Sequence, residues 1–158
     1  MYQIGEKIVH PMYGAGIIES LDEKEIDGVS QRYYVLQIPV GNLTIMISAA
    51  KAESQGIRNI HSADEVVQII QSITDASIDM PDNWNQRYKE NMERIKSGKL
   101  AEVALVYRNL LLRERERGLS TAEKKLMTTA KQIILSEIIL SKDIERVEAE
   151  ELLENLFR

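Results

Sequence analysis

The hydrophobic pattern of this chain changes its period near residue 61, which limits the chain to a strand-rich segment followed by a helical one. Turn signals such as Asp27-Gly28 separate short β-branched or aromatic runs, which cover residues 8–10, 15–21, 33–40, 43–47 and 57–60. Four or five antiparallel strands of this length usually curl to hide their edges. Residues 1–60 are therefore predicted to form a small antiparallel β-barrel.

From residue 62 onward the apolar residues follow a helical spacing. Ser62 precedes Glu65 by three positions, which is the capping-box signal for the start of a helix, and Ser120 and Glu123 repeat it. Gly98 and Gly118 are expected to end helices. Five helices are predicted, beginning near residues 62, 84, 100, 120 and 143. The fold class is therefore predicted as α+β, with a barrel domain over residues 1–60 and a helical-bundle domain over residues 61–158.

The residue types that enzymes and metal sites need are scarce in this chain. Cysteine is absent, and the two histidines, His10 and His61, lie in different predicted elements without a neighbouring metal-ligand pattern. Gly14-Ala15-Gly16 is followed by Glu19, where a dinucleotide-binding loop needs glycine, and by a strand instead of a helix. We therefore predict a protein that is not an enzyme, with no catalytic residue, metal site, cofactor or small-molecule substrate.

The sequence also carries no signal for a membrane. No apolar run approaches the ~18 residues of a membrane span, and the first residues lack the pattern of a signal peptide. The absence of cysteine is consistent with a reducing compartment. We expect a cytoplasmic protein without a membrane partner.

Charge is distributed unevenly along the chain, although the net charge of the whole is −5. Residues 61–83 carry five acidic and no basic residues, whereas residues 84–131 carry 12 basic and 6 acidic residues, a net charge of +6. The basic segment begins at the only tryptophan. Such a segment is typical of a nucleic-acid partner, but a solvated helical surface has the same pattern, and charge alone does not separate the two.

The tryptophan lies in the most informative stretch, residues 80–89. Pro81 and Asn83 favour a helix start, so Trp84 is expected in the first turn, where backbone N–H groups are free to bind phosphate. Arg87 and Tyr88 follow three and four residues later and share its face. An indole beside cations can insert into a base step while the cations hold phosphates. The alternative at this point is that Trp84 is a core residue.

Several short sequence motifs, spread over most of the chain, are informative because of their order and spacing. They are Gly5-Glu6-Lys7-Ile8-Val9-His10-Pro11, Tyr34-Val35-Leu36, Leu43-Thr44-Ile45, Asn83 to Asn91, Lys96-Ser97-Gly98, Glu116 to Ser120 and Glu123-Lys124-Lys125. In these blocks the chain resembles the CarD/CdnL family of bacterial transcription regulators. The likeness covers both halves up to about residue 141.

The resemblance implies that a Tudor-like N-terminal module docks on the β subunit of RNA polymerase while the helical domain contacts promoter DNA. In the family, the tryptophan that matches Trp84 wedges into the minor groove at the upstream edge of the transcription bubble and lengthens the life of the open complex. The contacts are largely independent of sequence, and we expect a monomer that acts at the nucleoid with polymerase. The DNA-binding residues implied are Trp84, Arg87, Tyr88, Lys89, Arg113, Lys124 and Lys125.

Polymerase docking is assigned to an edge strand over residues 44–47, because an exposed strand can pair with a strand of a partner. Some relatives place Arg where this chain has Lys24 and Met46. The alternating pattern is equally compatible with Ile45 and Ile47 facing the barrel core while Met46 points outward. The polymerase-binding residues implied are Lys24, Thr44, Ile45, Met46 and Ile47.

Three other interpretations remain open on the sequence. An interaction adaptor would use the β module for another protein and would not bind DNA through its helices. The β module also resembles that of the transcription-repair coupling factor, but the ATPase motifs of that translocase are missing. A helix-turn-helix repressor needs a helix that reads bases, and the face over residues 132–136 is mainly apolar.

Overall fold

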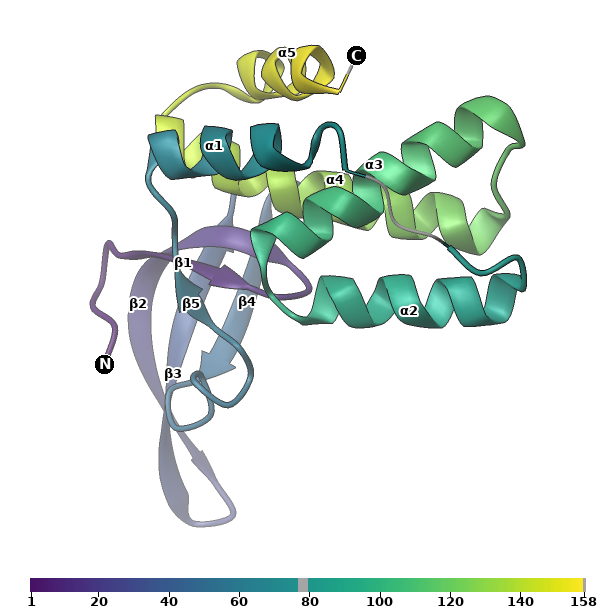
Figure 1. Ribbon diagram of the computed structural model, residues 1–158. Coiled ribbons are helices and arrows are strands. Elements are labelled where there is room, and N and C mark those ends of the chain that lie inside the picture. Colours follow the sequence, from purple (N-terminus) through teal and green to yellow (C-terminus); the bar gives the residue numbers. More distant parts are fainter. Residues whose placement is uncertain (77–79, 158) are drawn as a thin grey trace.

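The computed structural model describes residues 1–76 and 80–157 and contains a five-stranded antiparallel sheet followed by five helices (Figure 1). This arrangement confirms the predicted α+β class. The strand order is β4-β3-β2-β1-β5, so β4 and β5 are the edge strands of the sheet as described. The strands are β1 (Lys7–His10), β2 (Gly14–Ile26), β3 (Val29–Ile38), β4 (Leu43–Ser48) and β5 (Arg58–Asn59).

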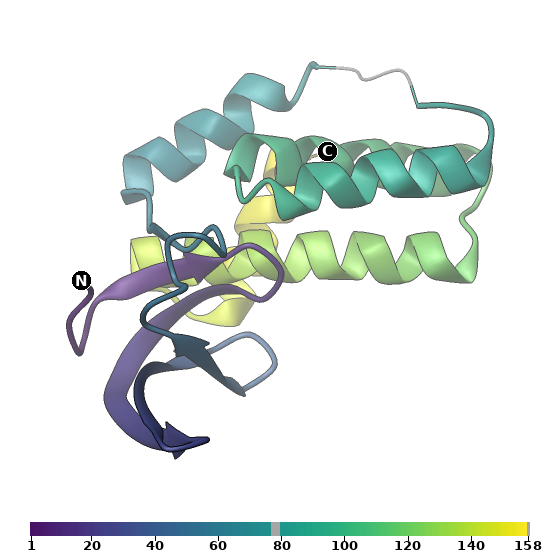
Figure 2. The same ribbon diagram turned by 90° about the horizontal axis from the view of Figure 1, so that it is seen from below.

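The sheet curls around its own apolar core (Figure 2). The long strands β2 and β3 pair from Ile17–Gln37 to Ile26–Val29, and an irregularity between Ile18 and Ser20 bends the hairpin. Along the second half of β3 alternate residues face inward, whereas Val9 and Ala15 are buried in a separate cluster with Leu140 of the helical domain. The fully or nearly buried members of this core are Ile8, Ile18, Tyr34, Leu36, Ile38, Ile47, Ala52 and Ile57.

The helices are α1 (Ala63–Ile73), α2 (Trp84–Lys96), α3 (Leu100–Glu116), α4 (Thr121–Lys142) and α5 (Arg146–Leu156). Side-chain caps start α1, α2 and α4, whereas α3 and α5 begin without one. Ser62 and Glu65 exchange the two hydrogen bonds of a capping box, and Gly98 and Gly118 take positive φ values of 74° and 79° after their helices. The last helix begins later than the expected residue 143, because Asp143 takes the left-handed conformation and ends the preceding helix.

The helical core is built around α3 and α4, which pack along much of their lengths. Leu110 of α3 and Ile134 of α4 are fully buried in this core. The rings of Tyr107 and Phe157 meet edge to face at 5.5 Å, which attaches the C-terminal helix to α3. Among the helices described, none is long and apolar enough to cross a membrane.

The second half of α4 lies against the β1–β2 turn, where the two parts of the molecule meet. The amide N of Ala15 donates to Ser136 Oγ at 2.7 Å. Gly14 has φ +97°, and a Cβ at this position would collide with Ser136 Oγ and lie 3.3 Å from Ile133 Cα. Glycine is therefore required at position 14 both for the positive φ and for close packing against α4.

Candidate nucleic-acid interface

The end of the helical domain farthest from the sheet is formed by the start of α2, the end of α3 and the start of α4 (Figure 1). Trp84 is the first residue of α2, and the residue is 49% exposed. Asn83 caps the helix, since its Oδ1 accepts a hydrogen bond from the amide N of Gln86 at 3.1 Å. The predicted cap is confirmed, and Trp84 is not a core residue.

Tyr88 supports Trp84 from the next turn of α2. The two rings lie edge to face, with centroids 6.4 Å apart and an interplanar angle of 74°. Tyr88 is half-buried and packs against the helical core. This contact restricts the indole while leaving half of its surface open to a partner.

Arg87 does not face solvent, which corrects the expectation that it contacts phosphate. Its residue exposure is 3%, and its Nε and second Nη donate to the two carboxylate oxygens of Glu123 at 2.7 and 2.9 Å. The first Nη donates to the carbonyl oxygens of Pro81 and Asp82 at 3.0 and 3.1 Å. Arg87 therefore ties the segment before Trp84 to the start of α4 and acts as a positioning residue.

Both members of this pair are held in their charged forms. The hydrogen bond from Arg87 holds the pKa of Glu123 below its usual range, although burial acts in the opposite direction. The same hydrogen bond raises the pKa of Arg87. Removing one member of a buried pair leaves an uncompensated charge and typically costs about 3–5 kcal/mol. The support beneath Trp84 is therefore stiff.

Sequence reasoning identified Glu123 only as a capping residue and missed its role as the partner of Arg87. Ser120 does cap α4, because its Oγ accepts from the amide N of Glu123 at 3.2 Å and also donates to Glu123 Oε1 at 3.1 Å. The carboxylate is thus shared between the cap and an arginine 36 residues away. The capping-box spacing gave no indication of this second partner.

The remaining cations predicted for DNA binding are open to solvent to different degrees. Lys89, Lys124 and Lys125 are exposed, the last two near the start of α4. Arg113 is half-buried, and its Nε is shielded from solvent without a hydrogen-bond partner among the residues described. Arg117, which the sequence analysis did not select, is an exposed cation at the C-cap of α3, close in sequence to the same end of the domain.

The residues expected to bind polymerase lie on two parts of the sheet. Residues 44–47 belong to β4, which is an edge strand as predicted. Met46 is 41% exposed, but Ile47 is only 2% exposed, so the side chain of Ile47 belongs to the sheet core and only its backbone remains at the edge. Lys24 is exposed on the β2–β3 hairpin and pairs with Gln31, beyond the part of β3 that pairs with β4.

The two remaining residues of that set, Thr44 and Ile45, and His10 have structural contacts. Thr44 is exposed and donates to Gln37 Oε1 at 2.5 Å, while Ile45 is half-buried against the sheet core. His10 Nδ1 accepts from the amide N of Met12 at 3.1 Å, and burial lowers the pKa of His10. No group of three or more metal-ligating side chains occurs within residues 1–76 and 80–157.

Comparison with known proteins places the two halves of the chain in one family. The model of the CarD-like/TRCF RID domain matches residues 2–61, and the model of the CarD C-terminal domain matches residues 66–154. The chain belongs to the CarD family. This CarD-family chain is 38% identical over 144 residues to the protein named "Putative transcription factor YdeB" of Bacillus subtilis (strain 168), covering 91% of this chain and 94% of that protein.

Proposed function

We propose that this CarD-family transcription regulator docks on the β subunit of RNA polymerase through β4 and stabilises the promoter open complex by wedging Trp84 into the minor groove at the upstream edge of the bubble. The observation that carries the proposal is a half-exposed indole at the start of α2, directly after a segment that a buried ion pair ties to α4. An exposed aromatic side chain on so stiff a support suits insertion into another molecule better than adaptable contact.

The free-energy argument requires only preferential binding of one state. Unstacking a base step costs a few kcal/mol, and at the edge of a bubble this cost is already met by melting. A wedge therefore binds the melted fork more tightly than the closed duplex and shifts the equilibrium toward the open complex. About 1.4 kcal/mol of preference changes the equilibrium tenfold. No bond is made or broken, so the mechanism needs no catalytic residue.

The exposed lysines near Trp84 supply contacts that do not depend on sequence. Lys89, Lys124 and Lys125 are exposed and free to approach phosphates. Three or four phosphate contacts give a salt dependence of only about −3 in log K against log salt, which corresponds to weak binding of free duplex. Docking of a single copy on polymerase provides the effective concentration that weak DNA binding lacks.

The direct test is the lifetime of open complexes formed by bacterial RNA polymerase on a ribosomal RNA promoter. Wild-type protein should lengthen the lifetime, and Trp84→Ala should lose this effect while retaining its melting temperature and its affinity for polymerase. Tyr13→Ala is a matched control, because Tyr13 is also 49% exposed but lies in the β1–β2 turn. If neither wild type nor Trp84→Ala changes the lifetime, the wedge is wrong and the adaptor interpretation replaces it.

A further inference from the structure

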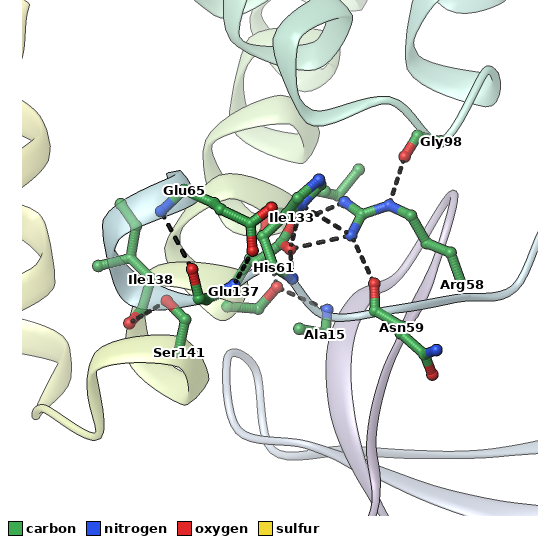
Figure 3. Close-up of polar contacts among 12 residues, drawn as sticks. Ala15, Arg58, Asn59, His61, Glu65, Gly98, Ile133, Glu137, Ile138 and Ser141 are labelled. Atoms are coloured by element: carbon green, nitrogen blue, oxygen red, sulfur yellow. Dashed lines mark hydrogen bonds and ion pairs between the residues drawn. The ribbon is translucent and has the colours of Figure 1, made fainter. Parts of the chain in front are cut away.

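The junction between the sheet and the helices is organised by one arginine, Arg58 of the short edge strand β5 (Figure 3). Its Nε donates to the carbonyl oxygen of Gly98 at 2.8 Å. Its two Nη atoms donate to the carboxylate of Glu137 at 2.6 and 2.9 Å, and one also donates to the carbonyl oxygen of Asn59 at 3.0 Å. One planar side chain thus connects β5, the α2–α3 turn and α4.

Glu137 is the acceptor at the centre of this junction. It is 0% exposed, and besides the two bonds from Arg58 it accepts one from the amide N of His61 at 2.9 Å. The Nδ1 of His61 lies 2.9 Å from the same carboxylate oxygen. A buried carboxylate with this many donors has one favourable arrangement, and shifting the sheet relative to α4 would break several bonds together.

The bond to Gly98 connects this junction to the tryptophan helix. Gly98 follows the C-cap of α2, and Trp84 is the first residue of the same helix. Arg58 holds the near end of α2 to the sheet, while Arg87 holds the far end to α4 through Glu123. Glu123 and Glu137 are 14 positions apart on α4, about 21 Å along the helix axis.

We infer that Arg58 is a positioning residue that fixes the distance and direction from the β4 edge to Trp84. This inference rests on the proposed function, in which one surface docks on polymerase and the other must reach the edge of the bubble. A rigid connection gives the wedge a high effective concentration at one place, and a loose connection lowers that concentration without changing either surface.

The conservative substitution Arg58→Lys tests this role. Lysine keeps the positive charge beside Glu137 but cannot form the planar fork that reaches Gly98 and both carboxylate oxygens. The contacts from Ala15 to Ser136 and from Lys7 to the carbonyl oxygen of Leu140 remain, so we expect the variant to fold. Arg146→Lys is the matched control, because Arg146 forms an exposed pair with Glu150 at 3.4 Å within α5.

Two measurements separate positioning from general stability. The chain has no cysteine, so spin labels on cysteines introduced at Asn42 and Glu90, both exposed, report the distance between the sheet and α2. We expect a narrow distribution in the wild type and in Arg146→Lys, and a broader one in Arg58→Lys. Open-complex lifetime should fall at least about threefold in Arg58→Lys, while affinity for polymerase alone and for a preformed fork alone stays within about twofold.

An unchanged distance distribution in Arg58→Lys would overturn the inference, and so would a broadened distribution with an unchanged lifetime. If Arg58→Lys does not fold, Glu137→Gln keeps the shape of the acceptor and is tested in the same way. Failure of the proposed function is recognised separately, because wild-type protein would then leave the lifetime unchanged, whereas the spin-label distances depend only on the junction.

Discussion

An Arg–Glu pair lies at each end of the helical domain, and the two pairs differ in what they join and in their access to water. At the outer end, Arg87 and Glu123 come from helices of the same domain, and their side chains are 4% and 2% exposed. At the inner end, Arg58 comes from the sheet and is 24% exposed, while Glu137 is 0% exposed. The same type of ion pair therefore has two roles. The outer pair holds the start of the Trp84 helix, and the inner pair orients the helices relative to the sheet.

The largest expected effect comes from breaking the outer pair. Glu123→Ala should lower the free energy of unfolding by about 3–5 kcal/mol, because Arg87 is left charged in the interior. Glu137→Ala should cost less, because the partly exposed Arg58 can turn toward water. Urea unfolding measures both. Glu102→Ala is the control for a half-exposed pair, with an expected cost below about 1 kcal/mol. An equal or larger loss in Glu137→Ala would show that access to water does not distinguish the two ends.

A smaller effect is expected from the glycine at the inner end. Gly14→Ala should destabilise by about 2–3 kcal/mol, because the added Cβ meets Ser136 and the α4 backbone at Ile133 in addition to the strain of a positive φ. Gly28→Ala is the matched control, since Gly28 also has a positive φ but has no atom within 4 Å of its added Cβ. Thermal unfolding of the two variants gives the difference, and equal melting temperatures would argue against close packing at the junction.

A fall in pH should lower the contribution of both Arg–Glu pairs to the stability of the fold. Burial raises the pKa of Glu137, but Arg58 and His61 outweigh it, so the pKa of Glu137 is below its usual range, and Arg87 lowers that of Glu123. A carboxylate with a lowered folded-state pKa contributes stability above its unfolded pKa of about 4.3, and this contribution is lost as the pH falls through the folded-state value.

The loss of stability should be visible as a fall in the free energy of unfolding, measured by urea unfolding between pH 6 and pH 3. Glu123→Gln and Glu137→Gln should each reduce the fall in the free energy of unfolding between pH 6 and pH 3. A variant that keeps the full slope of the wild type would mean that its carboxylate does not contribute to acid unfolding.

The smallest expected effect is on phosphate contact at the outer end. Lys124→Gln should reduce the slope of log K against log salt for a fork DNA by about 1, because one phosphate contact is removed. Lys142→Gln, an exposed lysine at the opposite end of the same helix, should leave the slope unchanged. A fluorescence titration over salt measures both variants. Equal slopes for the two would place the phosphate contacts away from the start of α4.

What the sequence predicted well was determined by neighbours within a few residues. The caps at Ser62 and Asn83 and the turn at Gly98 depend on groups three or four positions away, and all are present. The exposure of Met46 beside the buried Ile47 follows from the period of two in a strand.

What the sequence did not reveal depends on contacts between distant segments. Arg87 and Glu123 are 36 residues apart, and Arg58 and Glu137 are 79 apart. Arginine is usually a surface residue, so the sequence gives no reason to expect either side chain in the interior. Only the packing of the helices and the sheet shows that Arg87 is buried and that Arg58 spans the junction. The assignment of Arg87 to phosphate was wrong for this reason.

The central claim is that Trp84 enters the edge of the bubble, and a fluorescent base reports this most directly. With 2-aminopurine at the upstream edge of the promoter bubble, wild-type protein bound to polymerase should increase the fluorescence, because the wedge unstacks that step. Trp84→Ala, bound to polymerase to the same extent, should give no increase, and Tyr13→Ala should behave as the wild type. An equal increase with Trp84→Ala would contradict the account.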